Sequence, residues 1–145
     1  MHIDMISDKN VHDALAPAIG KPCCPQRVGR GRSLSVDFGE RVLNQRDTTM
    51  DPFYGEWEFG TYSSAWRIVQ AGHVVCGSSD IVDSISELNG RLRVIPFGAI
   101  VSLEQTSRFD IRLLLDGELS IDFMCASNDG DHIFHIFGPN NIYIE

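Results

Sequence analysis

Residues 107–125, SRFDIRLLLDGELSIDFMC, decide the fold of this chain. Apolar and polar residues alternate on both sides of Asp116 and Gly117, which is typical of two strands with one buried face joined by a tight turn. A two-residue turn at Asp116 and Gly117 would place apolar residues opposite polar ones. A three-residue loop over 115–117 instead places apolar residues opposite apolar residues. The loop predicts three cross-strand pairs: Leu113 with Leu119, Ile111 with Ile121 and Phe109 with Phe123.

The same alternation marks further strands on the N-terminal side. Residues 33–38, SLSVDF, alternate strictly, Gly39 is expected to end that strand, and residues 41–45 are a candidate hairpin partner. Residues 65–77 predict a second hairpin with its loop at 70–72. In that register Ile68 faces Val74, and Trp66 faces Cys76.

The last hairpin is expected near the C-terminal end of the sequence. Residues 133–137 and 142–144 flank a Gly-Pro-Asn-Asn turn at 138–141. Apolar residues occur on both faces of these strands, which predicts a position inside a sheet rather than at its edge.

One pentapeptide is nearly repeated. Leu34-Ser-Val-Asp-Phe38 and Leu119-Ser-Ile-Asp-Phe123 differ only in the third residue. Two β units of common ancestry would explain the repeat, and so would the ordinary pattern of strands with one wet face.

Two helices are expected beside the strands. The first occupies residues 10–19, and the second starts at Asp80, with Asp83 completing a capping box and Gly90 at the C-terminal end. Residues 20–32 are rich in glycine, proline and arginine, and they predict an irregular loop.

These elements predict an α+β fold. We expect a mainly antiparallel curved β-sheet or open barrel of about seven to nine strands, with an N-terminal helix and one inserted helix. A single domain over residues 1–145 accounts for the whole sequence, because this length can bury a core without disulfides or a metal.

Composition and charge narrow the class of function. The net charge of −8 disfavours nucleic acid as a partner and favours a basic one. The sequence shows neither a signal peptide nor an apolar run long enough to cross a membrane, so we expect a cytoplasmic protein. Cys76 and Cys125 are interpreted as small buried hydrophobes. The adjacent Cys23 and Cys24 leave their redox state open.

No catalytic or metal site is predicted, and no motif indicates a cofactor. His132 and His135 are three residues apart in a strand and therefore lie on opposite faces, where they cannot share a metal ion. We expect both to be edge or surface histidines. Serine and aspartate in residues 77–80 are interpreted as helix-capping residues rather than as a nucleophile.

The candidate partner-binding residues are acidic, with one aromatic. Glu56 and Glu58 share the outward face of a strand if Trp57 and its neighbour Phe59 face the core. Trp57 is nevertheless a candidate for an exposed aromatic anchor. Asp80 and Asp83 at the second helix complete the set.

Several short motifs resemble those of a loosely defined, uncharacterised family of small bacterial proteins, some of which look like immunity components of toxin systems. The motifs are AIGKP at 18–22, GRSLSVDFG at 31–39, GEW at 55–57, AWRI at 65–68 and GSSD at 77–80. The resemblance implies a toxin-neutralising role and supplies no catalytic residues.

The resulting prediction is a small acidic protein-binding domain, an immunity protein that occludes a basic toxin by charge complementarity. Two alternatives remain. One is an enzyme that acts on a small molecule through carboxylate and histidine groups in a sheet cleft. The other is an assembly subunit or homodimer that pairs with copies of itself, for which residues 141–145 would offer an uncovered edge strand.

Overall fold

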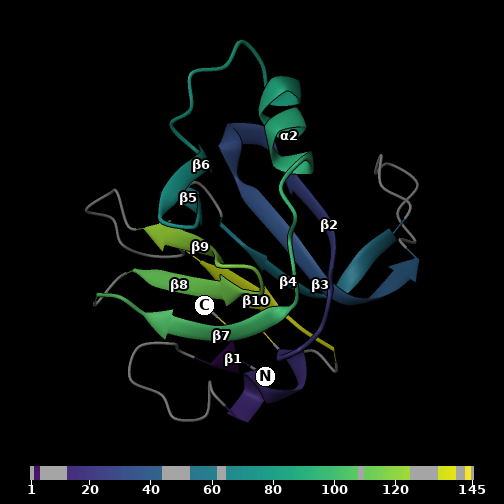
Figure 1. Cartoon of the computed structure of the whole chain (residues 1–145). Helices are drawn as coiled ribbons and strands as arrows, with labels where there is room; N and C mark the ends of the chain where they lie inside the picture. The colour runs from purple at the N-terminus through teal and green to yellow at the C-terminus, as the bar shows by residue number, and fades with distance from the viewer. Residues whose placement is uncertain are drawn as a thin grey trace.

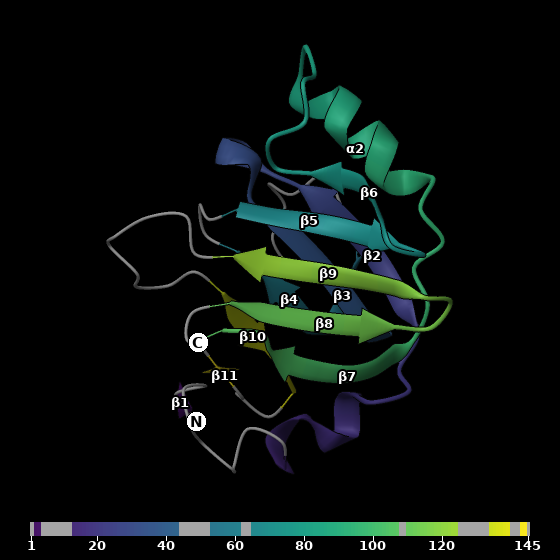
Figure 2. The ribbon, with the colours of Figure 1, turned by 60° about the vertical axis from the view of Figure 1, so that its left-hand side comes forward.

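The computed structural model describes residues 2–3, 13–43, 53–61, 65–107, 110–124, 134–139 and 143–144. Eleven strands in this part of the chain form two sheets, and every strand pair is antiparallel except β1 with β11. The predicted α+β class with open, mainly antiparallel sheet is confirmed, although the strands are divided between two layers that face each other (Figures 1 and 2).

The first sheet contains six strands. Their spatial order is β1 (His2–Ile3), β11 (Tyr143–Ile144), β10 (His135–Phe137), β4 (Phe53–Gly60), β3 (Leu34–Leu43) and β2 (Cys23–Val28). The last predicted hairpin is present, and β10 and β11 both have neighbours on each side. The C-terminal strand is therefore not an edge of the sheet.

The second sheet contains five strands. Their spatial order is β6 (His73–Gly77), β5 (Ala65–Gln70), β9 (Leu119–Met124), β8 (Ile111–Leu115) and β7 (Ile100–Gln105). Figure 2 shows this sheet in front, with β2, β3 and β4 behind it.

One hydrophobic core lies between the two sheets. Alternation along the strands sends Phe38 of β3, with Trp57 and Phe59 of β4, into this core, where each is at most 1% exposed. Phe134, just before β10, joins the layers, because its ring centroid lies 6.2 Å from that of Phe59 and 4.7 Å from that of Phe123 on β9. Large aromatic side chains supply much of the buried apolar area of such a core.

The helix α2 (Ile85–Arg93) starts later than predicted. Its N-cap is Ser84, whose hydroxyl accepts a hydrogen bond from the Glu87 N–H at 3.2 Å. Asp80 therefore lies outside the helix, and Gly90 lies inside it rather than at its end. The prediction failed because several Ser and Asp residues precede the apolar stripe, and any of them can cap.

The helix α2 closes one side of the core. Leu88 and Leu92 are buried beneath it, and it lies beside β2 of one sheet and β6 of the other. The Asn89 side chain accepts from Val28 N–H at 2.8 Å and donates to the Val28 carbonyl at 2.9 Å. This amide pairs with the edge of β2 as a neighbouring strand would, which blocks further strand addition there.

Replacing Asn89 by alanine is expected to lower the free energy of unfolding by about 1–3 kcal/mol, because the Val28 N–H and C=O both lose their partner. Denaturant unfolding measures the change, and Ser86→Ala on the exposed side of α2 is the matched control. An equal effect of the two substitutions would show that the Asn89 pairing contributes no stability.

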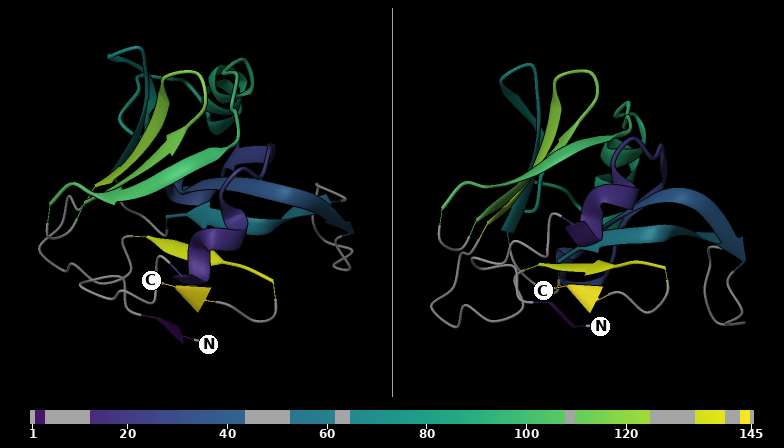
Figure 3. Two further views of the ribbon diagram at one scale, coloured as in Figure 1. Left: turned by 60° about the horizontal axis from the view of Figure 1, so that its bottom comes forward. Right: turned by 90° about the horizontal axis from the view of Figure 1, so that it is seen from below.

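The opposite end of the core is closed by the N-terminal helical segment. Residues 13–15 are α-helical, and Ala16–Ala18 continue as one 3-10 turn, η1, that buries Leu15 and Ala18. Figures 1 and 2 show this segment at the bottom of the molecule, remote from α2 at the top, and Figure 3 looks toward that end. No helix in the described residues is both long and apolar enough to cross a membrane.

One predicted loop and one predicted strand end are wrong. Residues 20–32 contain β2 and a 3-10 turn, η2 (Arg30–Arg32), instead of an irregular loop. Gly39 does not end a strand, since β3 continues to Leu43 through a bulge between Phe38 and Arg41. Residues 41–43 are thus the end of β3 and not its hairpin partner.

Both predicted hairpin registers are wrong. The apolar face is right for β8–β9, but Val74, predicted to face Ile68 in the core, instead lies opposite Val69 and is 57% exposed. In β5–β6 the turn has only two residues, Ala71 and Gly72, and a bulge lets Ile68 pair with Cys76. In β8–β9 the loop is 116–118, so the cross-strand pairs shift by two residues. The observed apolar pairs are Leu115 with Leu119, Leu113 with Ile121 and Ile111 with Phe123.

Candidate functional site

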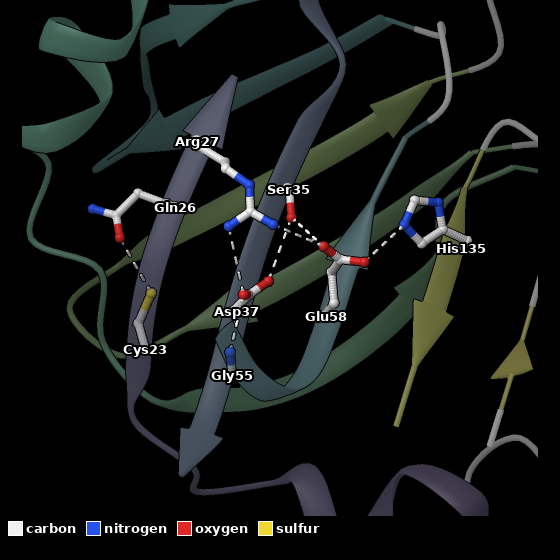
Figure 4. Close-up of polar contacts among 8 residues, drawn as sticks. All are labelled: Cys23, Gln26, Arg27, Ser35, Asp37, Gly55, Glu58 and His135. Carbon is white, nitrogen blue, oxygen red and sulfur yellow. Dashed lines mark hydrogen bonds and ion pairs between the residues drawn. The ribbon is translucent and has the colours of Figure 1, made fainter. Parts of the chain in front are cut away.

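A polar cluster lies on the face of the six-stranded sheet that points away from the core. Since Phe38 and Trp57 point inward, the neighbouring Asp37 and Glu58 point outward, and they are direct cross-strand partners. Arg27 of β2 pairs with Ser35 of β3, which extends the cluster on one side. His135 of β10 extends it on the other. We call Arg27, Ser35, Asp37, Glu58 and His135 the outer-face cluster (Figure 4).

Glu58 is the centre of the outer-face cluster. Its carboxylate accepts a hydrogen bond from the Ser35 hydroxyl at 2.6 Å. Arg27 Nη2 lies 3.5 Å from the same oxygen, and His135 Nε2 lies 3.5 Å from the other one. Residues of three other strands, β2, β3 and β10, therefore contact this one carboxylate of β4.

Asp37 lies deeper than Glu58. Its side chain is 0% exposed and accepts a hydrogen bond from the Gly55 N–H at 3.0 Å. The Ser35 hydroxyl lies 3.4 Å from its other oxygen, and Arg27 Nη1 approaches to 3.9 Å. Among the described residues, Asp37 thus has one close donor, the Gly55 N–H, and one distant cation, Arg27.

The environment drives the two carboxyl pKa values apart. Burial raises the pKa of Asp37 to about 6, assisted by the negative charge of Glu58 and opposed by the Gly55 N–H, Arg27 and Ser35. Burial also pushes the pKa of Glu58 upward. Hydrogen bonds from His135 and Ser35, with the nearby Arg27 charge, outweigh that effect and hold it below its ordinary value. When the pair holds a single proton, that proton therefore lies on Asp37.

Gly60 makes room for His135. A Cβ atom at Gly60 would lie 2.8 Å from the imidazole Cε1 and Nε2 atoms and 2.8 Å from the Leu34 carbonyl oxygen. The imidazole therefore lies directly against the backbone of β4. This packing buries His135, which corrects the prediction of an edge or surface histidine.

An exposed aromatic side chain borders the cluster. Phe137 is 42% exposed, its ring centroid lies 4.8 Å from that of His135, and it is the cross-strand partner of Glu58. An exposed aromatic side chain beside fixed polar groups is of the type enriched at protein–protein interfaces.

Trp57 is not an exposed anchor. It is 1% exposed and lies in the core, so that part of the prediction is wrong. The reason is the position of β4, which is an interior strand with the five-stranded sheet packed over its Trp57 face. Glu56 and Glu58 do share the outward face, as predicted, and Glu56 pairs with Lys21 at 3.0 Å.

Asp80 and Asp83 lie elsewhere, in the segment before α2 at the top of Figure 1. The Asp80 carboxylate binds Arg91 at 3.1 Å, and its carbonyl accepts from Arg32 at 2.7 Å. The exposed Asp83 contributes its N–H to Glu87 at 2.9 Å. The four predicted acids therefore do not form one surface. Three of them, Glu56, Glu58 and Asp80, already form ion pairs with basic residues of this chain.

The outer-face cluster was only partly visible in the sequence. Strict alternation in residues 33–38 indicates that Ser35 and Asp37 share a wet face. Nothing local indicates that Arg27 and His135 join them, because β2 and β10 reach this face through long-range pairing. His132 and Cys125 lie outside the described residues.

Among the described residues, no three His, Cys, Asp or Glu side chains are arranged to hold a metal ion. Comparison with known proteins gives no further guide. No family model, curated protein or solved structure matches this chain. Its function is therefore argued from the geometry of the outer-face cluster and its surroundings.

Proposed function

We propose that this chain is a protein-binding domain that docks its partner on the outer face of the six-stranded sheet. The observation that carries the proposal is the exposed Phe137 beside the ordered outer-face cluster. Interfaces between proteins are enriched in aromatic and arginine side chains that fill desolvated patches. Phe137 and Arg27 supply these two types on one face.

The polar network supports a binding role because its side chains are held in place before any partner arrives. Glu58 is fixed by Ser35, Arg27 and His135, so little side-chain entropy remains to be lost on docking. The network also keeps a buried carboxyl, Asp37, with a raised pKa. Perturbed ionisable groups occur preferentially at functional sites.

The partner we propose is a basic protein, and a toxin neutralised by occlusion is the specific form of the proposal. The net charge of −8 favours encounter with a basic surface. The resemblance of the short motifs to immunity components points the same way. Because Trp57 is buried in the core and Phe137 is exposed, the aromatic anchor of the proposal is Phe137.

A capture experiment with matched variants tests the proposal. The immobilised chain is incubated with lysate of the source cell at low salt, and bound proteins are read by mass spectrometry. We expect one stoichiometric basic protein, released by salt, whose recovery falls about tenfold or more with Phe137→Ala. Val94→Ala, an exposed apolar residue after α2, should leave recovery unchanged. Equal recovery with both variants, or capture that salt does not weaken, would contradict the proposal.

An enzyme acting through carboxylates is the second candidate, and the divergent pKa values of Asp37 and Glu58 favour it. A general acid and a general base need such a difference. Asp37 is 0% exposed, however, so no substrate atom reaches its carboxyl in this conformation. We therefore prefer the binding role.

A further inference from the structure

A row of alternating charges crosses the outer face of the five-stranded sheet. Arg67 of β5 lies opposite Asp122 of β9, Asp122 lies opposite Arg112 of β8, and Arg112 lies opposite Glu104 of β7. In strand order the row therefore reads plus, minus, plus, minus. Strands are about 4.8 Å apart, so the four groups form one straight line of about 14 Å.

Asp122 holds the two arginines of this row in place. Arg67 Nε and Arg112 Nε each donate to one carboxylate oxygen at 2.7 Å. Asp122 itself is 4% exposed, whereas both arginine side chains remain partly exposed. Each guanidinium binds Asp122 through its Nε, and Arg112 Nη2 also donates to the Asp122 carboxylate at 3.4 Å. The row is thus rigid at its centre and accessible above it.

No described helix or strand covers this face, which is turned toward the viewer in Figure 2. Apolar groups border the charge row. Val69 of β5 and Leu114 of β8 are half-buried, and Val74 of β6, the partner of Val69, is 57% exposed. A sheet face that combines a fixed charge pattern with exposed valine is suited to packing against another sheet.

We propose that a second copy of this chain packs on this face, related by a two-fold axis that runs parallel to the strands between β9 and β8. This rotation reverses the order of the strands across the sheet but leaves each residue at the same position along the strand direction. The charge row of one copy therefore lies directly over the charge row of the other. Arg67 of one copy then lies over Glu104 of the other, and Asp122 lies over Arg112. Every charge in the row meets its opposite, and the same contacts occur twice, as in an isologous dimer.

The alternating order favours a second copy over an unrelated acidic partner. An acidic surface would suit Arg67 and Arg112 but would be repelled by the exposed Glu104 at the end of the row. The net charge of −8 opposes self-association at long range. At about 0.15 M salt the Debye length is about 8 Å, so only the local pattern acts strongly. The outer-face cluster lies beyond the core and is left accessible by this dimer.

Sedimentation equilibrium on the purified chain at about 0.15 M salt tests the proposal. We expect a monomer–dimer equilibrium for the wild type. Glu104→Arg places like charges over each other at both ends of the row and should raise the dimer dissociation constant about tenfold or more. Glu40→Arg, the same charge change at an exposed position of β3, is the control and should have no such effect.

Mixing two variants supplies a second readout that misfolding cannot imitate. Arg67→Glu alone should also dissociate, because its new carboxylate faces Glu104 of the other copy. An equimolar mixture of Glu104→Arg and Arg67→Glu makes all four charge pairs complementary again, so heterodimers should form. The dimer proposal is overturned by a wild type that stays monomeric, by equal effects of Glu104→Arg and Glu40→Arg, or by folded variants that do not associate when mixed.

Discussion

The variant Asp37→Asn is expected to be more stable than the wild type at about pH 8, by up to about 3 kcal/mol, and nearly equal to it at about pH 4. The cause is the burial of the Asp37 carboxyl, which raises its pKa from an ordinary value of 3.8 to about 6. Asparagine has a similar shape, carries no charge, and keeps an oxygen that accepts from the Gly55 N–H.

The sign follows from proton binding. The folded chain holds the Asp37 proton more tightly than the unfolded chain does, so this group contributes its full stability below pH 3.8. That contribution is lost as the pH rises through about 6, where the buried carboxylate becomes charged. The amide of Asp37→Asn stays neutral throughout. The difference in free energy of unfolding should therefore grow between these two pH values and level off above them.

Urea unfolding of both proteins across this pH range gives the measurement, and Glu58→Gln supplies a control with the opposite sign. The pKa of Glu58 lies below its ordinary value of 4.5, so its contribution is present above that value and is lost as the pH falls through the folded pKa. Glu58→Gln should be less stable than the wild type at about pH 8, with the gap closing in acid. A destabilised Asp37→Asn at pH 8 would show that its carboxylate is well compensated by Arg27.

The faces of most strands were predictable from local alternation, because only one face of each strand meets the core. The exception is β6, where a bulge in the pairing with β5 puts Val74 on the outer face. Leu34, Val36 and Phe38 point inward, and so do Leu113 and Ile121, as their spacing indicates. Alternation reports the face of a residue but not its partner across the sheet, which explains why the class of fold was right while the registers were shifted.

The predictions of the β5–β6 turn and of a strand end at Gly39 were wrong for identifiable reasons. Ala71 has a φ of +48° in the β5–β6 turn, a conformation that alanine rarely adopts and that no local pattern suggests. A three-residue loop at 70–72 was therefore the reasonable prediction. At Gly39, with a φ of +92°, the glycine permits a bulge against the Glu56 side chain instead of ending the strand.

The two nearly repeated pentapeptides acquire a common physical meaning in the structure. Asp37 and Asp122 occupy the same position in their strands, point away from the core and yet are buried. Arg27 approaches the first, and Arg67 and Arg112 bind the second. The arginines come from neighbouring strands that the pentapeptides do not specify. The alternation of apolar and polar residues therefore places both aspartates on outward faces, but it does not identify the arginines that contact them.

Replacing Trp57 by alanine is expected to lower the free energy of unfolding by about 3–5 kcal/mol, the largest loss we predict for any single side chain here. Trp57 is 1% exposed, and its ring packs so closely that a Cβ at Gly138 would lie 2.7 Å from Cζ3. The truncation leaves a cavity that this close packing cannot fill. Trp57→Phe removes less volume and should lose less stability.

The exposed Phe137 provides the comparison that separates stability from binding. Phe137→Ala should change the free energy of unfolding by less than about 1 kcal/mol while it weakens capture of the partner. Trp57→Phe should show the reverse, with reduced stability in urea and unchanged capture at a temperature where it stays folded. If Trp57→Phe instead kept its stability and lost the partner, Trp57 would be the anchor despite its burial. Docking would then require the two sheets to separate at β4.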